Sequence, residues 1–505
     1  MKNKYTVLFL VLLAALFVAK IVYIGWGPLD LVPDEAHYWD WSRHPDISYY
    51  SKGPFIAYNI LAGTRLGDLL GFCPPNQAFW VRFPAVISAL LLGIISWLLA
   101  QRLWRDRRIA FWAVLLLAGI PIYAVGSILM TIDNPLMLFW AVYILLVFMA
   151  VDRDQGKYWY GAGFALGLGI LSKYTMLVMI PCVLGYLISN KQHRKWLRRK
   201  EFLGGLIISL LFLLPILIWN VDNNWVGLKH LLGQAGTGAG STGGWFSSHI
   251  GEFIGMQLVV VSPIIFVFIV IAFIKAVSPA GGRPGGCRDW RFRFLCWLGA
   301  PLGVLYLILS LHKACQANWP APAYFTGILL LVALFPRSRW LKAGIALGFI
   351  LWILLFSLPF ISGIPNKWDP TVRLRGWQEL GKEVGRVGDD LGSSGPYFIF
   401  SDTYQITSEL AFYVPGQPKT YCVNTGRRMN QYDLWQDFSR LKGLNAVYVK
   451  HRDQGLEPQI EGAFKSYQKL PLFHIRQYGR QIHCYSIFLC YGFKGFPEKD
   501  DEVTY

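Results

Sequence analysis

Apolar runs of about 20 residues recur through the first 360 positions of this 505-residue chain, with short polar loops between them. A helix needs this length to cross a hydrocarbon core of about 30 Å. The stretch 161–188 has basic loops on both sides and predicts a hairpin of two short helices with Ser172 and Lys173 at its tip. Counted as two, it brings the prediction to eleven spans. The others are residues 6–26, 83–100, 109–130, 135–151, 203–221, 253–274, 294–311, 321–335 and 343–362.

The loops between the runs predict the orientation in the membrane, because alternate loops are rich in Lys and Arg. The most basic segments are 101–108, 191–200, 275–293 and 336–342. Such loops stay in the cytoplasm, so we expect a cytoplasmic N-terminus, and the stretch from Asp34 and everything after residue 362 outside. Lys20, late in the first run, is expected to extend its amine to the outer interface.

The pattern changes after residue 362, where charged residues become frequent. Strands are predicted at 396–402, 419–424 and 445–451, helices at 407–414, 432–441 and 460–470, and a closing pair of strands within 473–493. The predicted fold is a polytopic α-helical membrane protein with a C-terminal extracytoplasmic α/β domain. Its domains are 1–362, with a large first outer loop at 27–82, and 363–505.

Composition excludes a soluble protein. Only 15% of the residues are charged and the mean hydropathy is +0.38, whereas soluble chains carry about 25% charged residues. The net charge of +18 lies mainly in the loops assigned to the cytoplasm, so we do not predict nucleic-acid binding. The eight cysteines form no CxxC pair. Cys422, Cys484 and Cys490 in the tail allow one disulfide.

Unusual polar residues gather on the predicted outer side. They occur in residues 31–54, 131–136, the tip at Lys173, 219–234 and 312–324. Because each segment begins or ends a span at the same predicted depth, we expect the five to line one cavity at the outer interface.

Three acids are candidates for catalysis. Pro33 favours a helix start, which places Asp34 and Glu35 in its first turn. An ionised carboxylate at the water edge can take a proton from an attacking hydroxyl; the alternative is that both are capping acids. Asp133 stands at the outer end of an apolar span, where an acid is costly and usually functional, although it also suits a helix start before Pro135.

The cations Lys52, Lys173 and Lys313 suit a phosphate, and for Lys173 a lipid headgroup is the alternative. The residues predicted to line the substrate site are His37, Tyr38, Tyr49, Tyr50, Trp219, Asn220, Gln234, His312 and Asn318. The sequence assigns no cofactor and leaves a divalent metal as an open alternative, for which His37 and His44 together with a carboxylate are the candidate ligands. The chain has neither a GxxxxGK[ST] motif nor a strand-linked GxGxxG.

Four of these segments resemble the bacterial GT-C glycosyltransferases that use polyprenyl-phosphate sugars, a family that includes protein O-mannosyltransferases and the lipid A aminoarabinose transferase. The matching segments are "PDEAHYWDWSRHPDISYYSKGPFIAY" (33–58), "TIDNPL" (131–136), "LSKYTM" (171–176) and "NWPAPAY" (318–324). The resemblance implies an inverting single displacement outside the membrane, from a lipid-phosphate sugar to lipid A, another glycolipid, a glycan or a protein. It implies Asp34 as the base, Asp133 as a supporting acid and Lys52 at the donor phosphate.

One departure from the aminoarabinose transferases stands out. They carry Glu-Lys-Pro-Pro where this chain has Ser51-Lys52-Gly53-Pro54, which argues for a different sugar or acceptor. The resemblance also implies the bacterial inner membrane, with the site facing the periplasm. The rival hypothesis is a secondary transporter or flippase for an anionic lipid or solute, whose site would lie near the midplane instead. A structural subunit would leave five converging polar loops unexplained.

Overall fold

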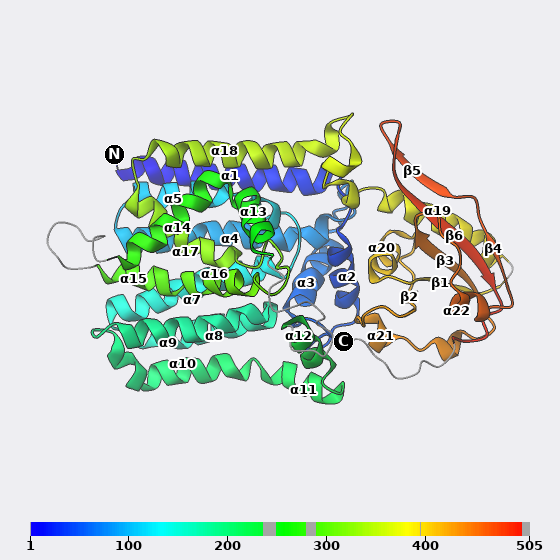
Figure 1. Ribbon diagram of the computed structural model, residues 1–505, viewed down its shortest axis with the longest axis horizontal. Helices are drawn as coiled ribbons and strands as arrows, with labels where there is room; N and C mark the ends of the chain where they lie inside the picture. Colours follow the sequence, from blue (N-terminus) through cyan, green and yellow to red (C-terminus); the bar gives the residue numbers. More distant parts are fainter. Residues whose placement is uncertain (1, 236–248, 279–288, 394, 497–505) are drawn as a thin grey trace.

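The computed structural model describes residues 2–235, 249–278, 289–393 and 395–496. A bundle of helices makes up most of the molecule, and a small sheet lies at one end of it (Figure 1). The helices before the sheet are α1 Lys2–Trp26, α2 Pro33–Arg43, α3 Phe55–Leu70, α4 Phe79–Trp104, α5 Arg107–Gly119, α6 Pro121–Gly126, α7 Asp133–Arg153, α8 Lys157–Ser172, α9 Met179–Ser189, α10 Lys200–Leu211, α11 Leu214–Asp222, α12 Val226–Ala235, α13 Ile250–Val261, α14 Pro263–Val277, α15 Trp290–Trp297, α16 Ala300–Leu309, α17 Ala321–Leu334 and α18 Arg339–Ser357.

Six helical segments in the described ranges are long and apolar enough to cross a membrane, or seven if a bent pair counts as one span. The six are Asn3–Trp26, Phe79–Trp104, Asp133–Arg153, Lys200–Asp222, Trp290–Leu309 and Arg339–Phe360. The remaining predicted spans correspond to shorter or broken helices. The number eleven therefore stays a prediction.

Two breaks in the bundle have local causes. The predicted span 253–274 is broken in the structure, because α13 and α14 meet at Ser262 with a bend of 107°, as in a broken span or a re-entrant loop. Ser262 has a left-handed φ of 87°, and Pro263 lacks the N–H that would continue α13. In the predicted hairpin, α8 ends at Ser172 and Lys173 is extended, with φ −157° and ψ 130°. A short 3₁₀ turn, η1 (Tyr174–Val178), then leads into α9.

The tail forms a mixed sheet with strand order β2-β1-β3-β6-β4, and β5 pairs with β6. β1 is parallel to β2 and β3, whereas β6 is antiparallel to its neighbours. The tail elements are α19 Trp377–Gly392, β1 Tyr397–Ser401, α20 Tyr404–Tyr413, β2 Thr420–Cys422, α21 Tyr432–Trp435, β3 Asn445–His451, α22 Pro458–Gly462, β4 Ser466–Lys469, β5 Phe473–Gln477 and β6 Arg480–Tyr491.

The strands predicted in the tail are confirmed, but two features differ from the prediction. The sequence pattern missed α19. The helix predicted at 460–470 is wrong, because α22 ends at Gly462 and residues 466–469 form β4. Tyr467 pairs with Cys490 of β6, so the ladder partner outweighs the local helical preference. The sequence allowed one disulfide among Cys422, Cys484 and Cys490. All three are free thiols in the structure.

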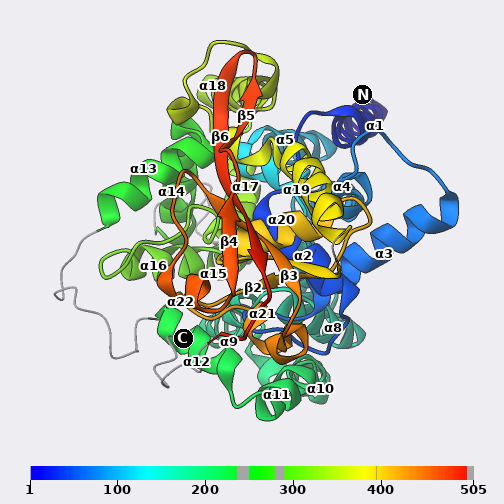
Figure 2. The same ribbon diagram turned by 90° about the vertical axis from the view of Figure 1, so that its right-hand side faces the viewer.

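The first outer loop is enclosed between the bundle and the sheet. Buried side chains of α2, including Ala36 and Trp39, share one hydrophobic core with α19, α20 and the inner face of the sheet, where Ile399 and Val447 lie. Figure 2 shows α2 and α20 behind the strands, at the centre of the bundle's end. The sheet therefore holds α2 in place on its membrane-distal side.

Candidate active site

Asp34 lies in the first turn of α2, which begins at Pro33 as predicted. Its side chain is exposed, and its Oδ1 accepts a hydrogen bond of 2.9 Å from the hydroxyl of Tyr404 in α20. Oδ2 has no hydrogen-bond partner among the described residues. One carboxylate oxygen is thus oriented by the tail, and the other is available to take a proton.

Glu35, also predicted to be catalytic, has a structural role instead. It is fully buried and forms an ion pair of 2.7 Å with Arg82 of α4. The same carboxylate accepts the backbone N–H groups of Val32 at 3.0 Å and Met130 at 2.7 Å. It links the start of α2 to α4 and to the segment before α7, and it has no access to substrate. The two acids are adjacent in the sequence but differ in exposure, because Asp34 is exposed and Glu35 is buried.

Asp133 begins α7 and joins two other predicted residues. Its Oδ1 lies 2.7 Å from the amine of Lys173, and its Oδ2 accepts a hydrogen bond of 2.6 Å from Asn318. The carboxylate has a partner on each oxygen, so it is suited to positioning Lys173 rather than to accepting a proton. Three segments that are distant in the sequence meet here.

Lys52 completes a group of charges around this point. Burial lowers the pKa of its amine to about 8, with the charges of Lys173 and Arg428 acting in the same direction and those of Asp133 and Asp34 opposing them. The amine has no hydrogen-bond or ion-pair partner among the described residues. A half-buried cation without an anion is suited to bind one.

Gly53 explains how Lys52 comes close to the hairpin tip. A Cβ at this position would lie 2.1 Å from the carbonyl oxygen of Leu171 in α8. Only glycine allows the first outer loop to pack directly on the end of α8. The departure from the aminoarabinose transferases therefore falls at a backbone contact that brings Lys52 towards Lys173.

Sequence reasoning missed three residues of the site. Tyr404 and Arg428 come from the tail, and His230 comes from α12. The Arg428 guanidinium donates to His230 Nδ1 at 2.9 Å, and burial together with the charges of Arg428 and Lys52 lowers the pKa of His230 to about 3. A neutral His230 is therefore an acceptor for Arg428. The signals in the sequence were the adjacent Arg427 and Arg428 in the tail and the position of His230 within the polar segment 219–234.

The aromatic residues of the first outer loop mainly build the loop itself. His37 is buried against the rings of Tyr404 and Tyr432, at 4.7 and 5.3 Å between ring centroids, and burial lowers its pKa to about 3. Tyr38 is also buried. Tyr49 stacks on Trp41 at 4.5 Å and donates to its carbonyl.

The remaining predicted lining residues fall into two groups. Tyr50, Trp219 and Asn220 are buried: the Tyr50 N–H donates to Gln431, the Trp219 indole to Asp46, and the Asn220 side chain braces the turn into α12. His312 is exposed and Lys313 lies over the ring of Trp319 at 5.9 Å, in the loop that also carries Asn318. The side chain of Gln234 lies outside the described residues.

The tail contacts α2 and the adjoining loop at several points besides Tyr404. Tyr432 donates to Asp40 at 2.7 Å, and burial raises the pKa of that carboxyl. The Leu31 N–H donates to Tyr413 at 2.8 Å. Such buried contacts make the tail part of the site's framework.

The described residues do not support a metal site. They contain no group of three His, Cys, Asp or Glu side chains that could hold a metal ion. His37 is packed among aromatic rings, and His44 contacts Trp435 at 4.7 Å while its Nδ1 meets the carbonyl of Asp40. Both candidate ligands, His37 and His44, therefore contact aromatic rings rather than other metal-binding side chains.

Solved structures with the same architecture identify the fold. The structure of ArnT from Cupriavidus metallidurans bound to undecaprenyl phosphate superposes with a TM-score of 0.62 at 16% identity, covering 97% of this chain and 98% of that one. The archaeal oligosaccharyltransferase AglB from Archaeoglobus fulgidus gives a TM-score of 0.54 at 14% identity, covering 88% of this chain and 69% of that one. The fold is GT-C, as predicted.

Sequence relatives decide the activity class. Residues 51–219 match the family model described as dolichyl-phosphate-mannose-protein mannosyltransferase. The lipid A galacturonosyltransferase RgtD of Rhizobium johnstonii is 26% identical over 78% of this chain and 80% of its own length. The chain is a GT-C glycosyltransferase.

A second relative adds to this assignment. The undecaprenyl phosphate-alpha-4-amino-4-deoxy-L-arabinose arabinosyl transferase 2 of Proteus mirabilis is 24% identical to this chain. The aligned region covers 64% of this chain and 58% of that relative. The comparisons do not support the transporter or flippase hypothesis.

Proposed function

We propose that this GT-C glycosyltransferase moves a sugar from a polyprenyl-phosphate donor, of the undecaprenyl-phosphate type, to an extracytoplasmic lipid acceptor such as lipid A. The observation that carries the proposal is an exposed, oriented carboxylate, Asp34, within charge range of Lys52, a half-buried cation that has no partner among the described residues. The names of the relatives and the undecaprenyl phosphate in the ArnT structure support the choice of donor and acceptor.

Each charged group has a part in the displacement. The acceptor hydroxyl oxygen attacks the anomeric carbon, and its proton passes to Asp34 Oδ2. The bond between that carbon and the phosphate oxygen breaks, and the phosphate leaves with the electron pair towards Lys52. Attack from the face opposite the leaving phosphate inverts the anomeric centre. Base assistance contributes typically about 10²–10⁴-fold, and cations at the leaving oxygen stabilise the charge that develops there.

Lys173 and Arg428 extend the phosphate site. Asp133, which itself accepts a hydrogen bond from Asn318, holds Lys173 in one position, so little ordering remains to be done when the donor binds. Arg428 has a planar guanidinium suited to phosphate oxygens and reaches the site from the tail. Because Arg428 belongs to the tail, the region 363–505 contributes directly to the proposed phosphate site. The proposed domain boundary stays at 362.

The bacterial inner membrane is the proposed location, with the site facing the periplasm. The Arg-rich segment 101–108 joins α4 to α5 at the end of the bundle away from the sheet, whereas the site and the sheet share the other end (Figure 1). The positive-inside rule assigns the Arg-rich end to the cytoplasm.

Purified protein in lipid nanodiscs tests the proposal with undecaprenyl-phosphate sugars as donors and lipid A as acceptor. We expect Asp34→Asn and Lys52→Ala to reduce release of undecaprenyl phosphate by about 10²-fold or more. Asp68→Asn is the matched control, because Asp68 is exposed near the end of α3. Transfer that survives both site substitutions unchanged would refute the assignment.

A further inference from the structure

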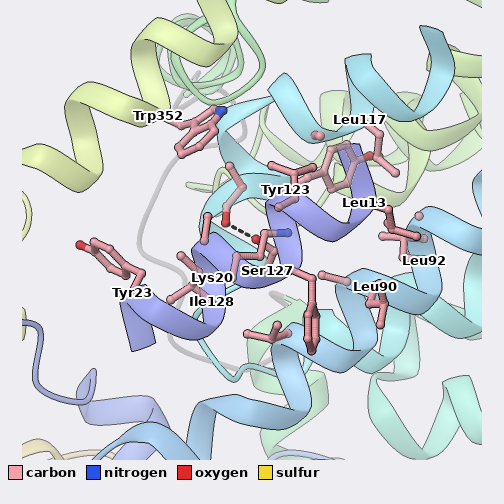
Figure 3. A pocket seen from close by; sticks show the side chains of 18 of the residues that line it. Leu13, Lys20, Tyr23, Leu90, Leu92, Leu117, Tyr123, Ser127, Ile128 and Trp352 are labelled. Carbon is pink, nitrogen blue, oxygen red and sulfur yellow. Dashed lines mark hydrogen bonds between the residues drawn. The ribbon is translucent and has the colours of Figure 1, made fainter. Parts of the chain in front are cut away.

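A largely apolar pocket of about 190 Å³ lies within the bundle, away from the charged site. It is lined by α1, α4, α5, α6 and α18, with Leu13, Leu90, Leu117 and Trp352 among its walls (Figure 3). An apolar cavity of about 150 Å³ already accepts a small hydrocarbon. This pocket has room for a segment of an alkyl chain.

Two of the helices that line the pocket, α1 and α18, lie at the edge of the bundle. Of the six spanning segments, those containing α1 and α18 have the smallest buried shares, 11% and 22%. Lipid therefore surrounds both helices that flank the pocket. A lipid chain can enter between them without first crossing the aqueous site.

One cation interrupts the apolar lining. Lys20 of α1 lies beside Ser127 in the pocket wall (Figure 3), and its amine has no hydrogen-bond or ion-pair partner among the described residues. It stands six residues before Trp26, which is about 9 Å along the helix axis, so the charge lies below the outer end of α1. A charge in this setting is costly without a counter-ion.

The pocket and the donor-phosphate cations flank the site from opposite sides. Lys52, Lys173 and Arg428 are associated with α8, α12 and the tail, whereas the pocket belongs to α1, α5 and α18. Figure 2 shows these two sets of helices on opposite sides of α2. The chain also connects pocket and site directly: three residues after Ser127, the Met130 N–H bonds to Glu35, the neighbour of Asp34.

We propose that this pocket binds an acyl chain of the acceptor, a phosphorylated anionic lipid, and that Lys20 pairs with an anionic group of that lipid. The inference rests on the proposed function. In-line displacement requires the acceptor to approach from the side opposite the leaving phosphate, and the pocket is on that side. The unpaired lysine supplies the charge complementarity that a neutral lipid would not use.

Binding measurements on the full-length protein in phosphatidylcholine nanodiscs test the inference. Lipid A is the probe for the acceptor, and undecaprenyl phosphate is the probe for the donor. Lys20→Met removes the charge, Lys20→Arg retains it, and Ala89→Phe or Ala118→Phe fills the pocket from α4 or α5. Leu91→Phe is the matched control, because Leu91 is 41% exposed and lies outside the pocket lining.

We expect Lys20→Met to raise the Kd for lipid A about tenfold or more, the size expected for one charged hydrogen bond. Either filling variant should also raise that Kd, because the phenylalanine ring occupies volume that the acyl chain would fill. Lys20→Arg and Leu91→Phe should keep the wild-type Kd, and the Kd for undecaprenyl phosphate should not change in any variant. Unaltered lipid A binding would overturn the inference. So would loss of undecaprenyl phosphate binding instead, or competition by phosphatidylglycerol equal to that by lipid A.

The proposed function fails separately from this inference. If the wild-type protein transfers no sugar from any undecaprenyl-phosphate donor, the proposed reaction is wrong whatever the pocket binds. If transfer proceeds and the KM for lipid A is the same in Lys20→Met, Ala89→Phe and the wild type, only the pocket assignment is wrong.

Discussion

Replacing Glu35 with glutamine removes the negative charge that holds the start of α2 against α4. The carboxylate is fully buried, and it receives the Arg82 side chain as well as the backbone N–H groups of Val32 and Met130. Glutamine keeps the shape but leaves Arg82 without a counter-ion, and its amide nitrogen cannot accept the bonds that the lost oxygen accepted.

Breaking a buried ion pair by changing one partner costs about 3–5 kcal/mol. Arg82 keeps its bonds to the carbonyls of Leu29 at 2.9 Å and Asp30 at 2.6 Å, so we expect the lower part of that range. At roughly 2–4 °C per kcal/mol, a loss of about 3 kcal/mol should lower the unfolding temperature by about 6–12 °C. Arg82→Gln should cost at least as much, because it also removes the two carbonyl contacts.

Thermal unfolding of the purified protein and transfer kinetics of the same samples measure both effects. The double variant Glu35→Gln/Arg82→Gln should lose less free energy of unfolding than the two single variants lose together, by a coupling energy of about 1–3 kcal/mol. Asp34→Asn is the contrasting variant: it should lose transfer and keep the unfolding temperature. If Glu35→Gln unfolds within 1 °C of the wild type and yet loses transfer as Asp34→Asn does, the structural role of Glu35 is wrong.

Two further predictions concern the phosphate side. Gly53→Ala places a methyl group against the Leu171 carbonyl, so Lys52 is displaced and kcat/KM for the donor should fall about 10- to 100-fold; Gly251→Ala, with open space around it, should have no effect in the same assay. The Lys52 amine is charged below its pKa of about 8 and neutral above it, so the KM for the donor should rise as the pH increases through 8. Lys52→Arg should remove that rise between pH 7 and 9.5, and a rise that persists in Lys52→Arg would assign it to another group.

The candidate site was only partly accessible to sequence reasoning. Asp34, Asp133, Lys52, Lys173 and Asn318 stand out because ionisable or amide groups beside apolar spans are rare, and the structure brings them together. Their separate roles were not predictable, because neighbouring acids look alike in a sequence.

The tail shows the same limit. Its strands were predictable from alternating apolar residues, and β4 was not, because its conformation depends on pairing with β6. Tyr404 lies 370 positions after Asp34, and Arg428 lies 198 positions after His230, so no local pattern relates either residue to its partner. Their contribution depends on how the sheet docks on α2.

The sequence by itself determined that this protein resides in a membrane and which of its polar loops carry unusual charge, since hydropathy and charge placement are local properties. Only the tertiary structure decided which acid is exposed and which is buried, that Lys173 pairs with Asp133 whereas Lys52 has no partner among the described residues, and that a tail tyrosine orients Asp34. Burial and pairing arise when distant segments pack together, so they depend on contacts that no local pattern encodes.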